Sequence, residues 1–409
     1  MLNIIWISFF LIAFLTSLFK LVILGDQQIF AQLMQAMFSL SKSAFEISLG
    51  LTGVLALWLG IMKIGEKSGF IDLITCSLTP LFSRLMPEIP KGHPALGAIV
   101  MNISANALGL DNAATPLGIK AMQELQTLNP KPDTASNAQI LFLVINTSGV
   151  TLFPITIFTY RAQLGALNPT DVFIPILIAT YVSAMMGLLA VSFVQKINLL
   201  DKVVMAYLGG FTLIVAGLLT HFSNLSQAQM LVQSAIISNL ILFSLVTSFI
   251  IGAVYKRINA YEAFIEGAKE GFQTAILIVP YLVAMLVAIG VFRASGALDL
   301  LADLARMAVH NLGMDDRFID ALPTALMKPF SGSGARAMMI DTMKTHGVDS
   351  FVGRLASIVQ GSTETTFYVL AIYFGAVGVK RIRYAATCGL IADFSGIIAA
   401  IVVGYWFFG

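Results

Sequence analysis

Two stretches decide how this chain folds: NISANALGLDNAATPLGIKAM at residues 102–122 and MKPFSGSGARAMMIDTM at residues 327–343. From Asn106 onward the first aligns with the second without a gap. Both run through small residues that permit a tight turn, and both then continue as a short helix. The pair therefore predicts the same structural unit, a hairpin, in each half of the chain.

Two further matches follow the same order. INTSGVTLF at residues 145–153 aligns with VQGSTETTF at residues 359–367, and WLGIMKIGEKSGFIDL resembles AIGVFRASGALDL when a three-residue gap is allowed. Chance similarity between apolar segments could explain one such match, but three matches in the same order favour a duplication. We interpret the chain as a duplication, with halves at residues 1–200 and 201–409.

The composition requires a lipid environment. Of the 409 residues, 57% are hydrophobic and only 11% are charged, more apolar surface than a soluble core can use. A spanning helix needs about 20 mostly apolar residues. The stretches that meet this requirement are 3–24, 44–64, 170–195, 203–221, 229–254, 272–292 and 384–408. We expect an all-α, polytopic membrane protein.

Other apolar stretches are interrupted by Gly, Pro, Asn, Ser and charged residues. They are residues 94–128, 137–163, 318–346 and 351–378. Unpaired backbone is costly in hydrocarbon, so such segments persist only where protein or a water-filled cavity surrounds them. We expect re-entrant hairpins and broken helices here. Segments 27–43 and 258–273 have mixed polarity and predict separate interfacial helices.

The orientation follows from Lys and Arg in the short loops, which place the N-terminus in the cytoplasm. Four crossings per repeat and the unmatched helix 203–221 put an odd number of crossings between the halves. The second half would then enter the membrane inverted. Inverted repeats with broken helices are the architecture of many secondary transporters. We expect a multi-pass protein of the cell inner membrane.

The first group of candidate solute-binding residues lies on the first hairpin, at Asn102, Ser104, Asn106 and Asn112. Amide and hydroxyl groups can bind a polar solute without the cost of a buried net charge. The alternative is that these groups only satisfy the backbone freed at the turn. The sequence leaves both open.

The second hairpin offers Ser331 and Ser333 among glycines, followed by a helix from about Arg336. Small residues and a helix N-terminus together suit a carboxylate, a phosphate or a polar ring. Close packing of glycine-rich helices is the alternative. The Gly-Lys-Ser/Thr ending of a nucleotide-binding loop is missing.

The broken helices supply the remaining candidates. These are Asn146, Thr147 and Ser148 in the first, and Gln360, Ser362, Thr363, Glu364 and Thr365 in the second. Five polar residues in six, within an otherwise apolar segment, are not expected to face lipid. We expect these side chains to line a solute site between the halves.

Two carboxylates are candidates for ion coupling: Glu364 and Asp393, the latter in a final helix that is otherwise free of charge. An intramembrane carboxylate commonly serves as an ion ligand, a proton carrier or a substrate partner. We expect Na⁺ or H⁺ as coupling ion and no other cofactor. A structural ion pair, between Glu364 and Lys328 or Arg336, is the alternative.

Other activities have little support in the sequence. The four histidines are scattered without metal-ligand spacing, and the two cysteines lie far apart, so we expect no metal site. A net charge of +2 without a basic stripe argues against nucleic acid as a partner. Ser331 or Ser333 with Lys328 would be the nearest nucleophile and base, and we expect no enzyme and no catalytic residues.

The same motifs carry a family resemblance. NISANALGLDNAATPLGIKAM resembles the hallmark of the bacterial spore maturation proteins A. KPFSGSGARAMMIDTM and QGSTETTFYVLAIYFGAVGVKRIRYA are similar to the B proteins, as though the two were fused. Both belong to the nucleoside-recognition, or Gate, group, which is related in plan to parts of nucleoside and ferrous-iron transporters. The resemblance implies a Gate repeat in residues 1–200, and an extra helix with a second Gate repeat in residues 201–409.

We therefore expect a secondary transporter of a small polar solute, such as an amino acid, a short peptide or a nucleoside-like molecule. The alternative is a non-transporting recognition or scaffold component of envelope or spore maturation. Its expected partners are the solute, the lipid bilayer and further copies of itself, since transporters of related plan often form oligomers.

Overall fold

The computed structural model describes residues 2–109, 111–149, 152–311, 313 and 315–409, and its described residues form helices and no strands. In chain order these are α1 (Leu2–Ile23), α2 (Ile29–Lys67), α3 (Phe70–Leu85), α4 (Pro94–Ala107), α5 (Asp111–Thr127), α6 (Asn137–Thr147), α7 (Ile155–Gln163), α8 (Phe173–Gln195), α9 (Lys202–Ser223), α10 (Gln227–Tyr255), α11 (Ala260–Ala294), α12 (Ala297–Asn311), the 3₁₀ helix η1 (Arg317–Ala321), α13 (Leu322–Met327), α14 (Gly332–His346), α15 (Phe351–Ser362), α16 (Thr366–Ala376) and α17 (Ala385–Phe408). The predicted all-α class is confirmed.

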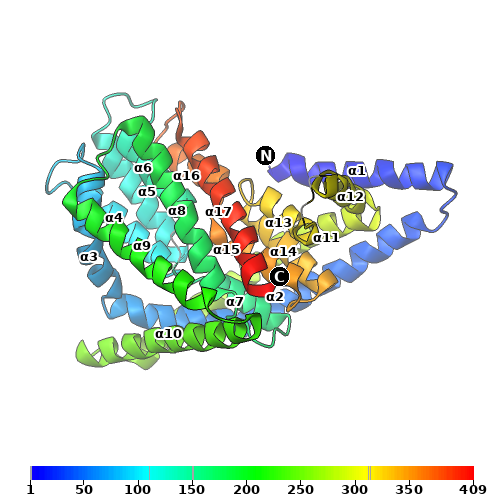
Figure 1. Cartoon of the computed structure of the whole chain (residues 1–409), viewed down its shortest axis with the longest axis horizontal. Coiled ribbons are helices and arrows are strands. Elements are labelled where there is room, and N and C mark those ends of the chain that lie inside the picture. Colours follow the sequence, from blue (N-terminus) through cyan, green and yellow to red (C-terminus); the bar gives the residue numbers. More distant parts are fainter. Residues whose placement is uncertain (1, 110, 150–151, 312, 314) are drawn as a thin grey trace.

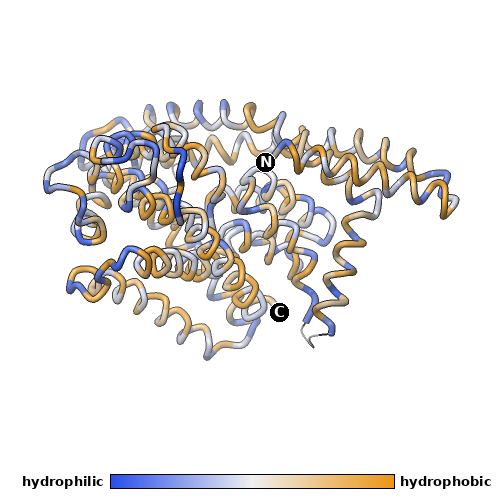
Figure 2. Tube along the Cα trace, turned by 90° about the horizontal axis from the view of Figure 1, so that it is seen from above, coloured by the Kyte–Doolittle hydropathy of each residue, from blue (hydrophilic) through white to orange (hydrophobic). Residues whose placement is uncertain are grey.

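Seven of the described helices are long and apolar enough to cross a membrane: α1, α2, α8, α9, α10, α11 and α17. They coincide with the seven predicted spans. Hydrophobic residues run along these helices, while hydrophilic ones gather in the connecting loops (Figure 2). The chain is a multi-pass membrane protein.

The predicted interfacial helices at 27–43 and 258–273 are wrong as separate elements. Each is the first part of a longer helix, α2 with 39 residues and α11 with 35. A helix that continues avoids leaving its last four carbonyl groups without partners. The polar residues are accommodated across the pair, since Lys63 lies 3.4 Å from Glu270 and Lys67 pairs with Glu266. The polarity of residues 258–273 therefore marks an α2–α11 contact, whereas Lys42 of the earlier segment pairs with Glu46 within α2.

The predicted interruptions are present. Gly109 joins α4 to α5 with φ +73°, a left-handed conformation that favours glycine. Non-helical segments separate α6 from α7, and α15 from α16. The helix expected from about Arg336 begins four residues earlier, at Gly332, because the Ser331 side chain accepts a hydrogen bond from the Gly334 amide at 3.0 Å and caps it.

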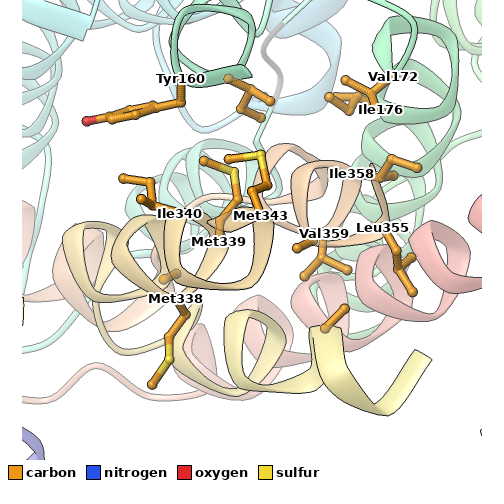
Figure 3. Packing of buried hydrophobic residues seen from close by; sticks show 14 of the residues in the cluster. Tyr160, Val172, Ile176, Met338, Met339, Ile340, Met343, Leu355, Ile358 and Val359 are labelled. Carbon is orange, nitrogen blue, oxygen red and sulfur yellow. The ribbon is translucent and has the colours of Figure 1, made fainter. Parts of the chain in front are cut away.

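Both halves contribute to one hydrophobic core. Met338, Met339, Ile340 and Met343 of α14 pack with residues of α15 and, from the first half, with Tyr160, Val172 and Ile176 (Figure 3). The helices of the two halves are likewise interleaved, with α17 beside α8 and α11 beside α2 (Figure 1). The halves are thus not independent folding units side by side.

A buried charge cluster fastens the loop of residues 161–171 to the start of α15. Arg161, which is 0% exposed, lies 2.8 Å from Asp171 and 3.1 Å from Asp349. Arg354 lies 2.8 Å from the other oxygen of Asp171. Two arginines and two aspartates leave no net charge, so each buried charge in the cluster has a partner of opposite sign, which offsets part of the cost of its burial.

Replacing Arg161 by Met should lower the stability of the protein by about 3–5 kcal/mol, because it leaves buried carboxylates without their main partner. Thermal unfolding of the purified protein in detergent measures the effect. Arg381→Met is the matched control, since Arg381 pairs with Asp133 at 3.7 Å in an exposed position and should change stability by about 0–1 kcal/mol. Equal midpoints for the two variants would contradict this account.

Candidate functional site

The two broken helices touch at their breaks. The amide of Glu364 donates to the carbonyl of Thr147, the last residue of α6, at 2.9 Å. Gly149 follows with φ +69°, and a methyl group there would lie 2.8 Å from the carbonyl carbon of Thr363. The break in each helix is therefore stabilised by the other, and only a glycine allows this approach.

Helices α8 and α17 pack behind the breaks through small residues. A side chain at Gly187 of α8 would meet Ala392 at 3.1 Å, and one at Gly396 of α17 would meet Thr363 at 2.6 Å. Ser183 donates across the pair to the Ala392 carbonyl at 3.0 Å. Close packing of this kind is how helices associate in membranes, and it holds Asp393 near both breaks.

A cavity of about 80 Å³ lies between the halves, beside the breaks. The first half contributes residues Gly109, Phe153–Ile157 and Tyr160, and the second contributes Lys328, Gly332, Arg336, Met339, Gln360, Gly361, Thr363 and Glu364. Charged groups of both signs thus share one small space. The guanidinium of Arg336 also lies 5.8 Å from the ring centre of Tyr160, which holds it against the cavity wall.

Three of the candidates from the sequence line this cavity: Gln360, Thr363 and Glu364. Glu364 is exposed, whereas Gln360 and Thr363 are buried. The Oε1 atom of Gln360 and the hydroxyl of Thr363 have no hydrogen-bond partner in the described part of the chain. These groups are available to a ligand. Gly332, the first residue of α14, brings the positive end of that helix to the same space.

The asparagines of the first half form a network of their own. Asn106 donates to Asn146 at 2.9 Å, Asn102 donates to the Ala114 carbonyl at 2.7 Å, and Asn146 donates to the Phe142 carbonyl at 2.9 Å. The network joins the first hairpin to the first broken helix. Its groups satisfy one another, which fits the structural alternative. The side chain of Asn112 lies outside the described residues.

Several hydroxyl candidates bond to their own helices. Ser104, Thr147, Ser148 and Ser362 each donate to a carbonyl three or four residues earlier. Ser331 caps α14 and lies 3.2 Å from Ser333. Thr365 precedes α16 as its N-cap, beside Gly332, and its hydroxyl has no partner in the described residues. None of these seven residues lines the cavity.

Asp393, the second carboxylate candidate, is fully buried in α17. The hydroxyls of Thr363 and Thr366 approach it, yet their geometry forms no hydrogen bond. Lys328 and Glu364 are near enough to act on it electrostatically. The structure thus places an isolated buried carboxylate directly behind the cavity, and Glu364 within it.

Thr366 and Tyr160 are among the residues of the site that were not selected from the sequence. Thr366 directly follows the polar run of 360–365 and continues it. Tyr160 gave no signal, because one aromatic residue in an apolar segment looks like core. Its role depends on Arg336, which is far away in the sequence.

The arrangement defines a class: polytopic α-helical membrane proteins in which two broken helices from different halves of the chain meet around a polar cavity. The family model described as Gate, nucleoside recognition, matches residues 48–165 and 275–380, more than half of the chain. The chain belongs to this family.

Two relatives from Bacillus subtilis (strain 168) each resemble part of the chain. Spore maturation protein B is 46% identical over 165 residues, covering 40% of this chain and 91% of its own length. Spore maturation protein A is 43% identical over 183 residues, covering 45% of this chain and 90% of its own length. These partial matches are consistent with a fusion of the two. No solved structure matches the chain.

Gly149→Ala should destabilise the protein by at least about 1 kcal/mol more than Gly165→Ala, because the added methyl collides with the Thr363 backbone. Gly165 is a matched control, since its φ is +82° but open space surrounds it. Both variants carry the strain of a left-handed alanine, about 1–2 kcal/mol. Their difference in thermal unfolding therefore isolates the contact between the breaks. Equal losses would show that the breaks do not touch.

Proposed function

We propose that the protein is a secondary transporter that binds a small polar solute in the cavity between the two halves. The observation that carries this proposal is the composition of the cavity wall. Backbone and side chains from both broken regions meet there, together with Glu364, Lys328 and Arg336. Discontinuous helices that meet at a repeat interface are the typical site of solute and ion binding in secondary transporters.

The size and charge of the cavity favour an amino acid among the solutes considered. A volume of about 80 Å³ is well below the ~300–1,000 Å³ of pockets that enclose drug-sized ligands. A nucleoside would need a wider opening than this conformation offers. Carboxylate and cationic groups on one wall, with the N-terminus of α14, suit a solute carrying both an amine and a carboxylate.

The duplication supplies the route between the two sides. We propose that residues 1–200 and 201–409 are repeats of opposite orientation, with the N-terminus in the cytoplasm and the protein in the inner membrane. The packing of corresponding helices supports this relation between the repeats. Helix α2 of the first half packs on α11 of the second, and α8 of the first half packs on α17 of the second. Rocking of one half against the other would expose the cavity to each side in turn.

A screen by thermal shift should find a solute that stabilises the purified protein, using amino acids, dipeptides, nucleosides and polyamines as probes. Binding to the folded state alone raises stability by about 2.7 kcal/mol at a hundredfold excess over Kd. Glu364→Gln should abolish the shift, because it removes the charge that faces an amine. Uptake of the same solute into proteoliposomes then tests transport.

Glu262→Gln is the control for this substitution. Glu262 lies in the first turn of α11, is exposed and does not line the cavity. It should keep the full shift. If no probe stabilises the parent, or if a stabilising solute is never transported, the non-transporting scaffold function is favoured instead.

A further inference from the structure

Unpartnered oxygen atoms gather where the breaks meet α17. Both carboxylate oxygens of Asp393, and the hydroxyl oxygens of Thr363 and Thr366, have no hydrogen-bond partner among the described residues. All three side chains are at least 98% buried. Leaving such groups unsatisfied is costly, and an ionised carboxylate costs most, so the cluster favours a ligand that oxygen atoms can bind together.

The helix geometry brings these groups to one place. Gly389, Asp393 and Gly396 lie on one face of α17. A side chain at Gly389 would lie 2.8 Å from Cγ2 of Thr366 and 3.3 Å from the hydroxyl of Thr147. Two turns on, a side chain at Gly396 would lie 2.6 Å from Cγ2 of Thr363. Asp393 therefore sits between two glycines that let both broken helices approach it.

The ends of these broken helices favour a positive charge. α6 ends at Thr147 and α15 at Ser362, and both ends lie at this junction. A helix C-terminus carries a partial negative charge equivalent to roughly half an elementary charge. The nearby charged side chains, Lys328 and Glu364, have opposite signs, so their effects on a cation oppose each other. Thr366 is the first residue of α16, whose positive end also lies here, so the carboxylate of Asp393 is the main group that attracts a cation.

The chemistry of the oxygens limits which cation fits. A proton on Asp393 is the competing ligand: it would make one carboxyl oxygen an O–H donor and leave the other as an acceptor for a threonine hydroxyl. A metal ion accepts lone pairs from every oxygen at once. Calcium sites usually contain several carboxylates. Among the unpartnered groups of this cluster in the described residues, Asp393 supplies one carboxylate and the threonines supply neutral hydroxyls. Among the described residues, no group of three or more His, Cys, Asp or Glu side chains offers a multivalent site.

We propose that Asp393, Thr363 and Thr366 bind a dehydrated monovalent cation, Na⁺, at the junction of α6, α15 and α17. Thr363 belongs both to this cation site and to the solute cavity, which it lines. Cation binding would fix the break of α15 in the conformation that holds Glu364 in the cavity. The role of this ion in coupling rests on the proposed transport function, whereas its binding does not.

Equilibrium binding of radioactive sodium to the purified full chain tests the proposal, with choline chloride keeping the ionic strength constant. The parent should bind Na⁺ saturably. Asp393→Asn should lose this binding, and Thr366→Val, which keeps the side-chain shape, should weaken it by roughly tenfold or more. Ser357→Ala is the matched control, because that buried hydroxyl donates to the Gly353 carbonyl at 2.8 Å within α15. It should bind as the parent does.

A parent protein without saturable Na⁺ binding would overturn the proposal, and so would unchanged binding in Asp393→Asn. Protection from thermal unfolding by Na⁺, relative to choline at constant pH, gives a second measurement that needs no variant. Solute uptake that does not depend on Na⁺ would reject a coupling role for the ion and leave the transport function standing. Saturable Na⁺ binding without uptake of any solute would do the reverse.

Discussion

The hydrogen bond from the Glu364 amide to the Thr147 carbonyl represents the constraint on which the structure depends. A helix that breaks within an apolar environment frees backbone donors and acceptors, and lipid cannot satisfy them. Here the two breaks satisfy part of that need for each other. The arrangement requires Gly149 at one break and extended backbone at Thr363 on the other.

Other features of the fold serve the same junction. The small residues of α8 and α17 let these helices support the breaks closely, and the long α2–α11 pair packs on the neighbouring helices α7 and α14. The charge cluster around Arg161 ties the segment after α7 to the start of α15, so the two broken regions are fastened at a second point. The polar cavity lies where the halves meet, and this is where we propose that a solute binds.

Much of the fold could be predicted because the signals are local. Runs of apolar residues give the seven long helices, and Gly109 and Gly149 mark positions where only a left-handed turn fits. The site was harder to predict, because whether a polar residue is free for a ligand depends on its hydrogen-bond partners, and the sequence does not show these partners. Ser362 and Thr363 are neighbours of similar chemistry, yet one bonds within its helix and the other has no partner in the described residues. Likewise, nothing local links Arg161 to Asp349, because only the tertiary fold brings them together.

The central claim is that the cavity between the halves opens to each side of the membrane in turn. Substituted-cysteine accessibility at Thr156, which lines the cavity from the first half, tests it most directly in a chain whose Cys76 and Cys388 have been replaced. The account predicts that a membrane-impermeant maleimide labels Cys at this position from either side in vesicles of opposite orientation, and that bound solute slows both reactions. Labelling from one side only, or from neither side, would contradict it.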